Sequence, residues 1–313
     1  MILNSSTTKR FLRGKMNKLT ALLLFFLLGH HAAPPLAAQE LKPGILYSIT
    51  GKGIKDTSWL FGTYHLVNSS YLDDLPAVKK AFARSGGVVV EIIADSTELL
   101  KAQQAGMLQN QQLSNLLDAP FRDSLDAELK NTIGAGLLQL NQLKPANVSL
   151  ILSVTHMIKN QSALLAKYAG LPLDAGFVAE GKQQGKTVKT LETITQQMDF
   201  LFNSSSLDEQ VLALKTFIRK KSEMTALSDE LIGKWFAQDL KAMWDVYEKT
   251  LQVSGEEDKL IKERNINWMK LLPQWIQQGS QFIAVGALHL GGKYGLVELL
   301  KQQGYSVVPV NTK

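Results

Sequence analysis

The sequence of 313 residues contains no cysteine, and this absence excludes several kinds of chemistry. Disulfide bonds, thiolate nucleophiles and metal sites built on cysteine are ruled out. A lipid-modified cysteine behind an N-terminal leader is excluded for the same reason. A protein exported without disulfides must rely on its apolar core. The length allows one large α/β domain or two small ones to build such a core.

The chain also lacks a charge imbalance once its first 38 residues are set aside. Of the 34 Lys and Arg residues, five lie within residues 1–38, which contain none of the 28 Asp and Glu residues. The rest of the chain therefore holds 29 basic and 28 acidic side chains, a net charge of +1. Because nucleic-acid-binding domains carry clustered positive charge, we expect no nucleic-acid partner.

Residues 1–38 have the composition of a secretory signal peptide. Basic residues precede an apolar run at residues 19–28, and small residues and prolines follow at residues 32–38. This order is typical of a leader removed on export, and the run is short for a membrane span; an uncleaved anchor is the alternative. We expect a periplasmic or secreted protein without a stable membrane span after cleavage, with Met1 or Met16 as its start.

Strand patterns concentrate at the two ends of the remaining chain, and helical periodicity fills residues 96–278. Strands are predicted at residues 44–50, 58–63, 88–93, 281–286 and 305–310, with a short one at 187–191. Helices are predicted at residues 97–109, 120–133, 146–168, 174–184, 207–228, 228–249, 256–278 and 296–302, and a further one begins near Pro76. The β-branched run at 88–93 predicts a strand covered on both faces.

These patterns predict an α/β fold in which both chain ends contribute to one sheet. The sheet is expected to be mixed and partly parallel, because the first two strands are close enough for a hairpin while strand–helix–strand units favour parallel pairs. The helical middle would form a large insertion or lid over it. We therefore expect residues 39–313 to form a single domain.

Two segments near opposite ends of the chain share a strand that runs into Gly-x-x-His-Leu. The first holds Gly62 and His65, and the second holds Gly286 and His289. Each is followed by a loop, a short helix, a glycine and a strand. Glycine allows a sharp turn or a close approach to a ligand, and ligands bind beyond the carboxyl ends of strands in open sheets. Both histidines are expected at that edge.

The other histidines carry no such pattern. His30 and His31 lie within the predicted leader, and His156 lies in the helix predicted at 146–168 without a partner motif. We interpret His156 as structural or solvent-exposed. Among the five histidines of the sequence, His65 and His289 are therefore the candidates for a site.

Glu91 is the third member of this candidate site. It follows three valines at the end of an apolar strand, where a buried carboxylate has to be paired, hydrogen-bonded or metal-bound; alternatively, the strand reaches solvent there. Two imidazoles and one carboxylate suit a divalent metal such as manganese, cobalt, zinc or iron, which would activate water for hydrolysis. Without metal, one histidine would act as general base with Glu91 orienting it. The residues leave both alternatives open.

Several motifs carry a family resemblance. They are Phe61-Gly62-Thr63-Tyr64-His65-Leu66, Leu75-Pro76, Val88-Val89-Val90-Glu91, Gly286-Ala287-Leu288-His289-Leu290, Gly295-Leu296, Leu299-Leu300 and Gly304-Tyr305, with looser matches at Leu173-Asp174, Gly185-Lys186, Leu191-Glu192, Arg264-Asn265 and Trp268. Together they resemble the TraB/GumN family, strongly at both ends and weakly from about 100 to 255. That family includes the Tiki metalloproteases, manganese- or cobalt-dependent peptidases with paired Gly-x-x-His motifs, and is distantly similar to erythromycin esterases and haem-binding ChaN-like proteins.

The resemblance implies an exported metal-dependent hydrolase that acts on peptides or proteins, with manganese, cobalt or zinc as its cofactor. His65, Glu91 and His289 would form the metal or catalytic site. Arg264 would face the same cleft and stabilise an oxyanion, with Asn265 as a further catalytic candidate. The alternatives are a metal-free, esterase-like hydrolase and a non-enzymatic haem- or metal-binding protein of the same fold, since fold similarity transfers a site more safely than a reaction.

Overall fold

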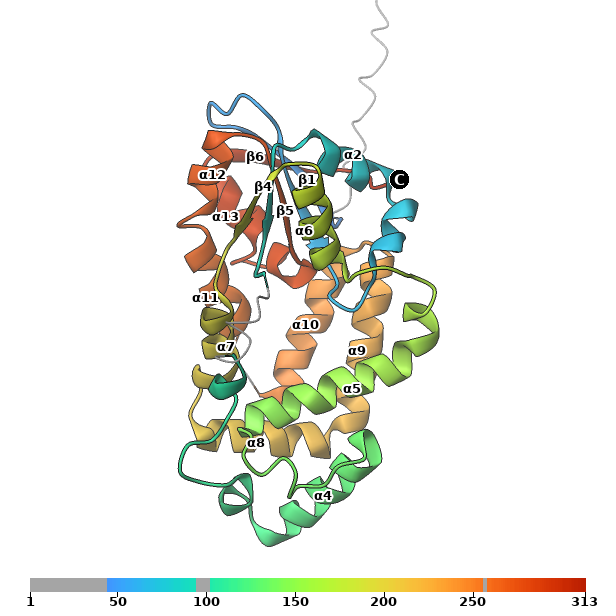
Figure 1. Cartoon of the computed structure of the whole chain (residues 1–313), viewed down its shortest axis with the longest axis vertical. Coiled ribbons are helices and arrows are strands. Elements are labelled where there is room, and N and C mark those ends of the chain that lie inside the picture. The colour runs from blue at the N-terminus through green and yellow to red at the C-terminus, as the bar shows by residue number, and fades with distance from the viewer. Residues whose placement is uncertain (1–43, 94–101, 256–257) are drawn as a thin grey trace, which may run out of the picture. The chain divides into compact units, whose positions relative to one another are not determined.

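The computed structural model describes residues 44–93, 102–255 and 258–313 (Figure 1). All of them lie within the compact unit Leu41–Lys313. The predicted signal peptide at residues 1–38 and most of the N-terminal half of the helix predicted at 97–109 lie outside the described residues. Residues 102–105 of that helix are helical, and the chain then turns at Gly106.

One six-stranded sheet runs through this unit in the order β4-β3-β5-β2-β1-β6. Its strands are β1 (Leu46–Gly51), β2 (Ser58–Thr63), β3 (Gly87–Val90), β4 (Thr187–Thr190), β5 (Gln281–Gly286) and β6 (Tyr305–Pro309). β1 pairs antiparallel with β2 and with β6, whereas β2, β3, β4 and β5 pair in parallel. The predicted α/β class, with a mixed sheet drawn from both chain ends, is confirmed.

The neighbours within the sheet differ from the simplest expectation. The strands of each Gly-x-x-His unit were expected to pair with each other, but β5 lies between β2 and β3, and β2 and β1 lie between β5 and β6. β5 is buried from Gln281 to Val285. Such an apolar strand is most stable with both edges paired, so it takes the centre and draws β2 and β3 to either side.

The helices lie largely where the sequence pattern predicts them, but several begin, end or divide at other residues. They are η1 (Ser69–Asp74), α2 (Pro76–Arg84), η2 (Leu113–Leu116), α4 (Ala119–Ile133), α5 (Pro145–Leu165), α6 (Leu173–Gln183), α7 (Ile194–Asn203), α8 (Leu207–Arg219), α9 (Lys221–Phe236), α10 (Leu240–Ser254), α11 (Lys259–Trp268), α12 (Leu272–Gln278), η3 (Ala287–Leu290) and α13 (Leu296–Gln302). The sequence analysis missed α7, which begins with a capping box between Thr193 and Gln196.

Three predicted helices divide differently, and one predicted strand is shorter at its C-terminal end. The helices expected at 207–228 and 228–249 break instead at Lys220 and at 237–239, where Gln238 has a φ of 58° and Asp239 caps α10. The helix expected at 256–278 divides into α11 and α12, since Pro273 occupies the first turn of α12 and cannot continue a helix. The strand expected at 88–93 ends at Val90.

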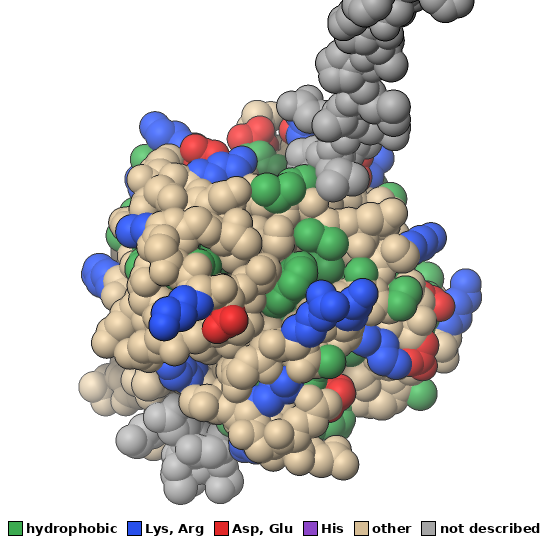
Figure 2. Space-filling model, turned by 90° about the horizontal axis from the view of Figure 1, so that it is seen from above, with side chains coloured by type: hydrophobic (Ala, Val, Ile, Leu, Met, Phe, Trp, Pro, Cys, Tyr) green, Lys and Arg blue, Asp and Glu red, His purple; other side chains and the backbone are tan. Residues whose placement is uncertain are grey.

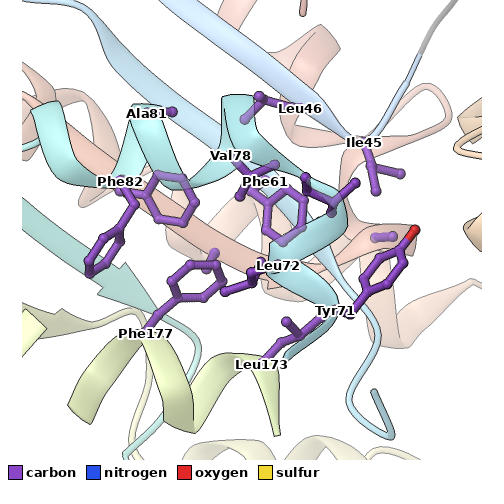
Figure 3. Packing of buried hydrophobic residues seen from close by; sticks show 14 of the residues in the cluster. Ile45, Leu46, Phe61, Tyr71, Leu72, Val78, Ala81, Phe82, Leu173 and Phe177 are labelled. Carbon is purple, nitrogen blue, oxygen red and sulfur yellow. The ribbon is translucent and has the colours of Figure 1, made fainter. Parts of the chain in front are cut away.

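Alternate residues of the strands feed two apolar layers, as the pleat of a sheet requires. On one face, Phe61 and Phe282 pack with Phe82 of α2 and Phe177 of α6 (Figure 3). On the other face, the strands contact α11, α12 and α13 through a second set of buried residues: Leu60, Val89, Ile283, Val285, Trp268, Leu272, Ile276, Leu296 and Leu300. The sheet is therefore covered on both faces (Figure 1).

A third apolar cluster belongs to the helical middle of the chain. It joins α4, α5 and α8 through Phe121, Leu125, Val148, Leu152 and Leu214. The helical middle thus has its own core instead of resting on the sheet alone.

In the described ranges 44–93, 102–255 and 258–313, no helix combines the length and the apolar character that a membrane span requires. Side chains of both charge signs are interspersed on the face shown in Figure 2.

Candidate functional site

The two Gly-x-x-His motifs and Glu91 meet at one point of the structure, the α-carbon of Gly286. A Cβ atom built there would lie 3.3 Å from Oε1 of Glu91, 3.3 Å from Nε2 of His65 and 3.7 Å from Cδ2 of His289. The sheet explains this meeting, because Thr63 pairs with Gly286 and Val90 with Ala284. The carboxyl ends of β2, β3 and β5 therefore deliver all three side chains to the same edge.

The two motif glycines have different tasks. A Cβ atom at Gly62 would lie 2.9 Å from both Cα and Cβ of Ala287, so this glycine allows η3, which carries His289, to pack against β2. The carbonyl oxygen of Gly62 accepts a hydrogen bond from the indole of Trp235 at 3.0 Å. Gly286 instead leaves open the space between the three functional side chains, and its N–H donates to Oε1 of Glu91 at 2.7 Å.

Arg264 of α11 holds the buried half of the site together. Its Nη2 donates to Oε2 of Glu91 at 2.5 Å and to Oε1 of Glu192 at 2.6 Å, and its Nε donates to both oxygens of Glu192. Its Nη1 lies 3.0 Å from Nε2 of His289. One guanidinium thus balances two buried carboxylates and contacts one imidazole, leaving this cluster with a net negative charge.

These surroundings set the charge of Glu91. Burial alone would raise the pKa of its carboxyl group. The charges of His289, which is protonated at the low pH where Glu91 titrates, and of Arg264 and His65 outweigh burial and lower the pKa to about 2. The hydrogen bond from the N–H of Gly286 acts in the same direction. Glu91 is therefore an ionised carboxylate at neutral pH.

His289 is neutral, and its tautomer follows from its neighbours. Burial lowers its pKa to about 3 despite the attraction of Glu91. An arginine can only donate hydrogen bonds, so Nε2 of His289 accepts from Arg264 and the ring proton lies on Nδ1. That N–H donates to Oδ1 of Asn265 at 2.7 Å. The ring also lies against Trp268, with 4.3 Å between ring centroids.

Asn265 contacts His289 from the interior of the protein. Its side chain is fully buried, and its amide nitrogen donates to the carbonyl oxygens of His289 and Tyr294 at 3.0 and 2.7 Å. All polar atoms of Asn265 are therefore used in fixing the loop and ring of His289. Asn265 is not among the residues at the Cβ position of Gly286, which are His65, Glu91 and His289.

His65 lies on the solvent side of this space, where 62% of its side chain is exposed. Its Nδ1 is 2.9 Å from Oδ2 of Asp174, and Oδ1 of Asp174 accepts a hydrogen bond from the hydroxyl of Thr63 at 2.8 Å. Desolvation opposes protonation of the ring, but the hydrogen bond and charge of Asp174 outweigh it and raise the pKa of His65. At neutral pH His65 thus carries a proton on Nε2, which has to leave before this nitrogen can act as a base or bind a metal.

Two carboxylates of the site, Asp174 and Glu192, were missed as functional residues. Asp174 lies in the first turn of α6, where an acidic residue is ordinary in a sequence. Glu192 follows β4, and its backbone N–H donates to the carbonyl oxygen of Glu91 at 3.1 Å. Like Glu91, Glu192 is a carboxylate just after a parallel strand, because β4 pairs with β3.

The residues fit a divalent cation in donor type and charge, and only partly in arrangement. Nε2 of His65 and Oε1 of Glu91 border the same space, and the buried cluster is net negative. However, Oε2 of Glu91 and Nε2 of His289 are already bonded to Arg264. Within residues 44–93, 102–255 and 258–313, no group of three or more His, Cys, Asp or Glu side chains is arranged to hold a metal ion.

Comparison with known proteins identifies a family. The model of the TraB/PrgY/gumN family matches residues 45–309, which is most of the chain. No curated protein and no solved structure matches the chain. The match includes both Gly-x-x-His motifs and every charged residue of the site described above.

Proposed function

The chain belongs to the TraB/PrgY/gumN family, as its motifs predicted, and on this basis we propose that it is an exported hydrolase of peptides or proteins that uses a divalent metal ion. Export to the periplasm or beyond rests on the composition of residues 1–38. Hydrolysis rests on His65, Glu91 and His289, which meet at Gly286, and on Arg264, which bonds to Glu91 and His289.

The single observation that carries the proposal is the meeting of these side chains at Gly286. An ionised carboxylate and an imidazole that follow different strands both lie 3.3 Å from the Cβ position of Gly286, and the imidazole of His65 is exposed to solvent. Hydrolysis of an amide or ester requires a positioned water and a group that takes its proton. Glu91 and Nε2 of His65, once deprotonated, are suited to hold such a water and accept its proton.

In this proposal the metal ligands are His65, Glu91 and His289, with manganese, cobalt or zinc as the ion. When bound, such an ion polarises a carbonyl and lowers the pKa of a water molecule. His65 has to release its Nε2 proton first, and His289 has to exchange its hydrogen bond from Arg264. Only about a tenth of the Arg264 side chain is exposed, so we assign to it the task of holding Glu91 and Glu192 in place.

Metal removal tests this proposal. After treatment with a chelator, we expect peptide hydrolysis by the purified protein to fall at least tenfold and to return when Mn²⁺ or Co²⁺ is added, because the ion supplies the Lewis acid. Elemental analysis of the untreated protein should find a divalent metal, and His65→Gln and His289→Gln variants should retain less of it. Full hydrolysis by a protein shown to contain no metal would contradict a metal-dependent reaction.

A metal-free hydrolase is the second candidate, and one observation favours it. Arg264 already satisfies Oε2 of Glu91 and Nε2 of His289, which leaves Nε2 of His65 as the imidazole nitrogen facing the open space. His65, backed by the carboxylate of Asp174, would then be the general base. Activity that survives complete chelation and is lost in His65→Gln would identify this mechanism.

Replacing Gly286 with alanine is expected to lower kcat/KM on the order of 100-fold, the cost of displacing reacting groups by a fraction of an ångström to an ångström. The added methyl group would press on Glu91 and His65 at 3.3 Å. The backbone tolerates alanine, since φ at Gly286 is −52°, so the melting temperature should change little.

Gly233 in α9 provides the matched control, because a Cβ atom there meets nothing within 4 Å. Gly233→Ala should keep full activity and should, if anything, stabilise the helix. If Gly286→Ala kept wild-type kcat/KM with a suitable substrate, the space in front of Gly286 would not be the reaction site.

A further inference from the structure

Asp174 and Thr63 form a chain of hydrogen bonds with His65 at the solvent side of the site. We propose that Asp174 is a positioning residue for the reaction: it fixes the ring of His65 so that Nε2, and not Nδ1, faces the space in front of Gly286. This inference rests on the proposed hydrolase function and names a residue that acts through His65 without touching the substrate.

The position of Asp174 is fixed by the fold. It lies in the first turn of α6, directly after Leu173, whose side chain is fully buried. The backbone N–H of Leu173 donates to the carbonyl oxygen of Val67 at 3.0 Å, which ties the start of α6 to the loop that carries His65. Gly176, in the same turn, leaves room for Ser69 of that loop, since a Cβ atom would lie 3.0 Å from Cβ of Ser69.

The hydrogen bonds determine what Asp174 does. Its two oxygens accept from two different donors, the hydroxyl of Thr63 at 2.8 Å and Nδ1 of His65 at 2.9 Å. A carboxylate accepts at both oxygens, so Thr63 holds the carboxylate while the carboxylate holds the imidazole. With Nδ1 engaged, Nε2 is the nitrogen that lies 3.3 Å from the Cβ position of Gly286.

His65 needs such a partner more than His289 does. The side chain of His65 is 62% exposed, so packing does little to restrict its rotamers, and fixing an exposed side chain costs conformational entropy. His289 is buried and is held by Arg264, Asn265 and Trp268. The two motif histidines are thus oriented by different means, one by burial and the other by a carboxylate.

The experiment compares Asp174→Asn and Asp174→Ala with the wild-type chain by two readouts. Asparagine can accept from Nδ1 of His65 and donate to the hydroxyl oxygen of Thr63 but carries no negative charge, whereas alanine makes neither bond. We expect kcat to fall about tenfold in Asp174→Asn and about 100-fold in Asp174→Ala, within the range for proton transfer by a positioned side chain, with KM changed less than about threefold. Thr63→Val, which leaves the bond to His65 in place, should lose less than about tenfold.

The second readout is the ¹⁵N NMR spectrum of the histidine rings in protein that carries ¹⁵N-labelled histidine. The resonances of His65, identified by their loss in His65→Gln, should report a hydrogen-bonded Nδ1–H in the wild type. In Asp174→Ala they should move to the values of a solvent-exposed imidazole with mixed tautomers. A merely structural role for Asp174 would lower stability without changing these resonances.

Glu128 provides a matched control. It forms the other hydrogen-bonded imidazole–carboxylate pair among the described residues, with Oε1 3.0 Å from Nε2 of His156, between α4 and α5. Glu128→Gln should shift the resonances of His156 and leave both kcat and the resonances of His65 unchanged. An unchanged kcat together with unchanged His65 resonances in Asp174→Ala would overturn the proposal.

The two readouts separate this inference from the function on which it rests. If the wild-type chain hydrolysed no peptide or ester, the hydrolase proposal would fail, and the NMR comparison would still decide whether Asp174 fixes the ring of His65. If the chain were active and Asp174→Ala shifted the resonances without lowering kcat, Asp174 would fix the ring but would not serve the reaction, which also overturns the inference.

Discussion

Replacing His65 with alanine is expected to lower hydrolysis by about 1,000-fold or more while leaving the free energy of unfolding within about 0.5 kcal/mol of the wild type. Either as a metal ligand or as a general base, Nε2 of His65 is the imidazole nitrogen open to the space in front of Gly286. Most of the side chain is exposed, and its one hydrogen bond is to Asp174, so its removal leaves the core intact. Peptide hydrolysis and urea denaturation of the same preparation measure both quantities.

His289→Ala should lose activity to a similar extent but also lose stability. The ring is buried, and its removal would leave Nη1 of Arg264 and Oδ1 of Asn265 without a partner; each such buried group costs about 1–3 kcal/mol. His156→Ala is the control. His156 pairs with Glu128 between α4 and α5, so its loss should leave kcat unchanged. Hydrolysis that persisted in both His65→Ala and His289→Ala would exclude the proposed site.

Arg264→Met is expected to destabilise the protein by about 3–5 kcal/mol, the usual cost of removing one partner from a buried ion pair. Methionine roughly keeps the length of the side chain but supplies no charge and no donor. Glu91 and Glu192 would then be two buried carboxylates that have lost their shared ion-pair partner. Urea denaturation at neutral pH measures the loss, and Glu192→Gln added to this variant should recover part of it.

The pH dependence of this loss has a defined sign. In the wild type the pKa of Glu91 is lowered to about 2, so its contribution to stability is present above the ordinary pKa of a glutamate and is lost as the pH falls through about 2. Without Arg264 one of the charges that lower the pKa of Glu91 is lost, so the buried carboxylate is less well compensated while it is ionised. The variant should therefore be most destabilised at neutral pH and recover towards the wild type in acid.

Lys241→Met on α10 is the control for removing a cation. Lys241 pairs with Asp245 on the surface, and surface pairs of this kind contribute little to stability. The urea midpoint of Lys241→Met should therefore equal that of the wild type. If Arg264→Met unfolded at the wild-type urea concentration at neutral pH, Arg264 would not be balancing the two buried carboxylates, and its task in the site would have to be assigned anew.

The sequence predicted the fold class and the meeting of His65, Glu91 and His289 for one reason. Each of these residues stands just after a strand, and parallel strands end at the same edge whatever their order. The order itself was not predictable from local pattern. β5 lies between β2 and β3 because it is the apolar strand that is stabilised most by a paired neighbour on each side. That stabilisation is a property of the assembled sheet.

The same limit explains the residues that were missed. Asp174 reaches His65 because α6 is tied to the loop after β2, and Glu192 reaches Arg264 because β4 pairs with β3. Both contacts join segments about 70 to 110 residues apart. The helix breaks at Lys220 and near Gln238 were missed because helical periodicity continues across them, and only packing shows where the chain turns.

The central place of β5 has a consequence for the order in which the protein forms. β5 ends at Gly286, close to the C-terminus, yet both of its neighbours lie in the first third of the chain. Contacts between such distant segments form slowly, and until β5 emerges from the ribosome β2 and β3 have no shared partner between them. The site therefore cannot exist on a growing chain. It forms only after the chain has been made as far as Gly286 and His289.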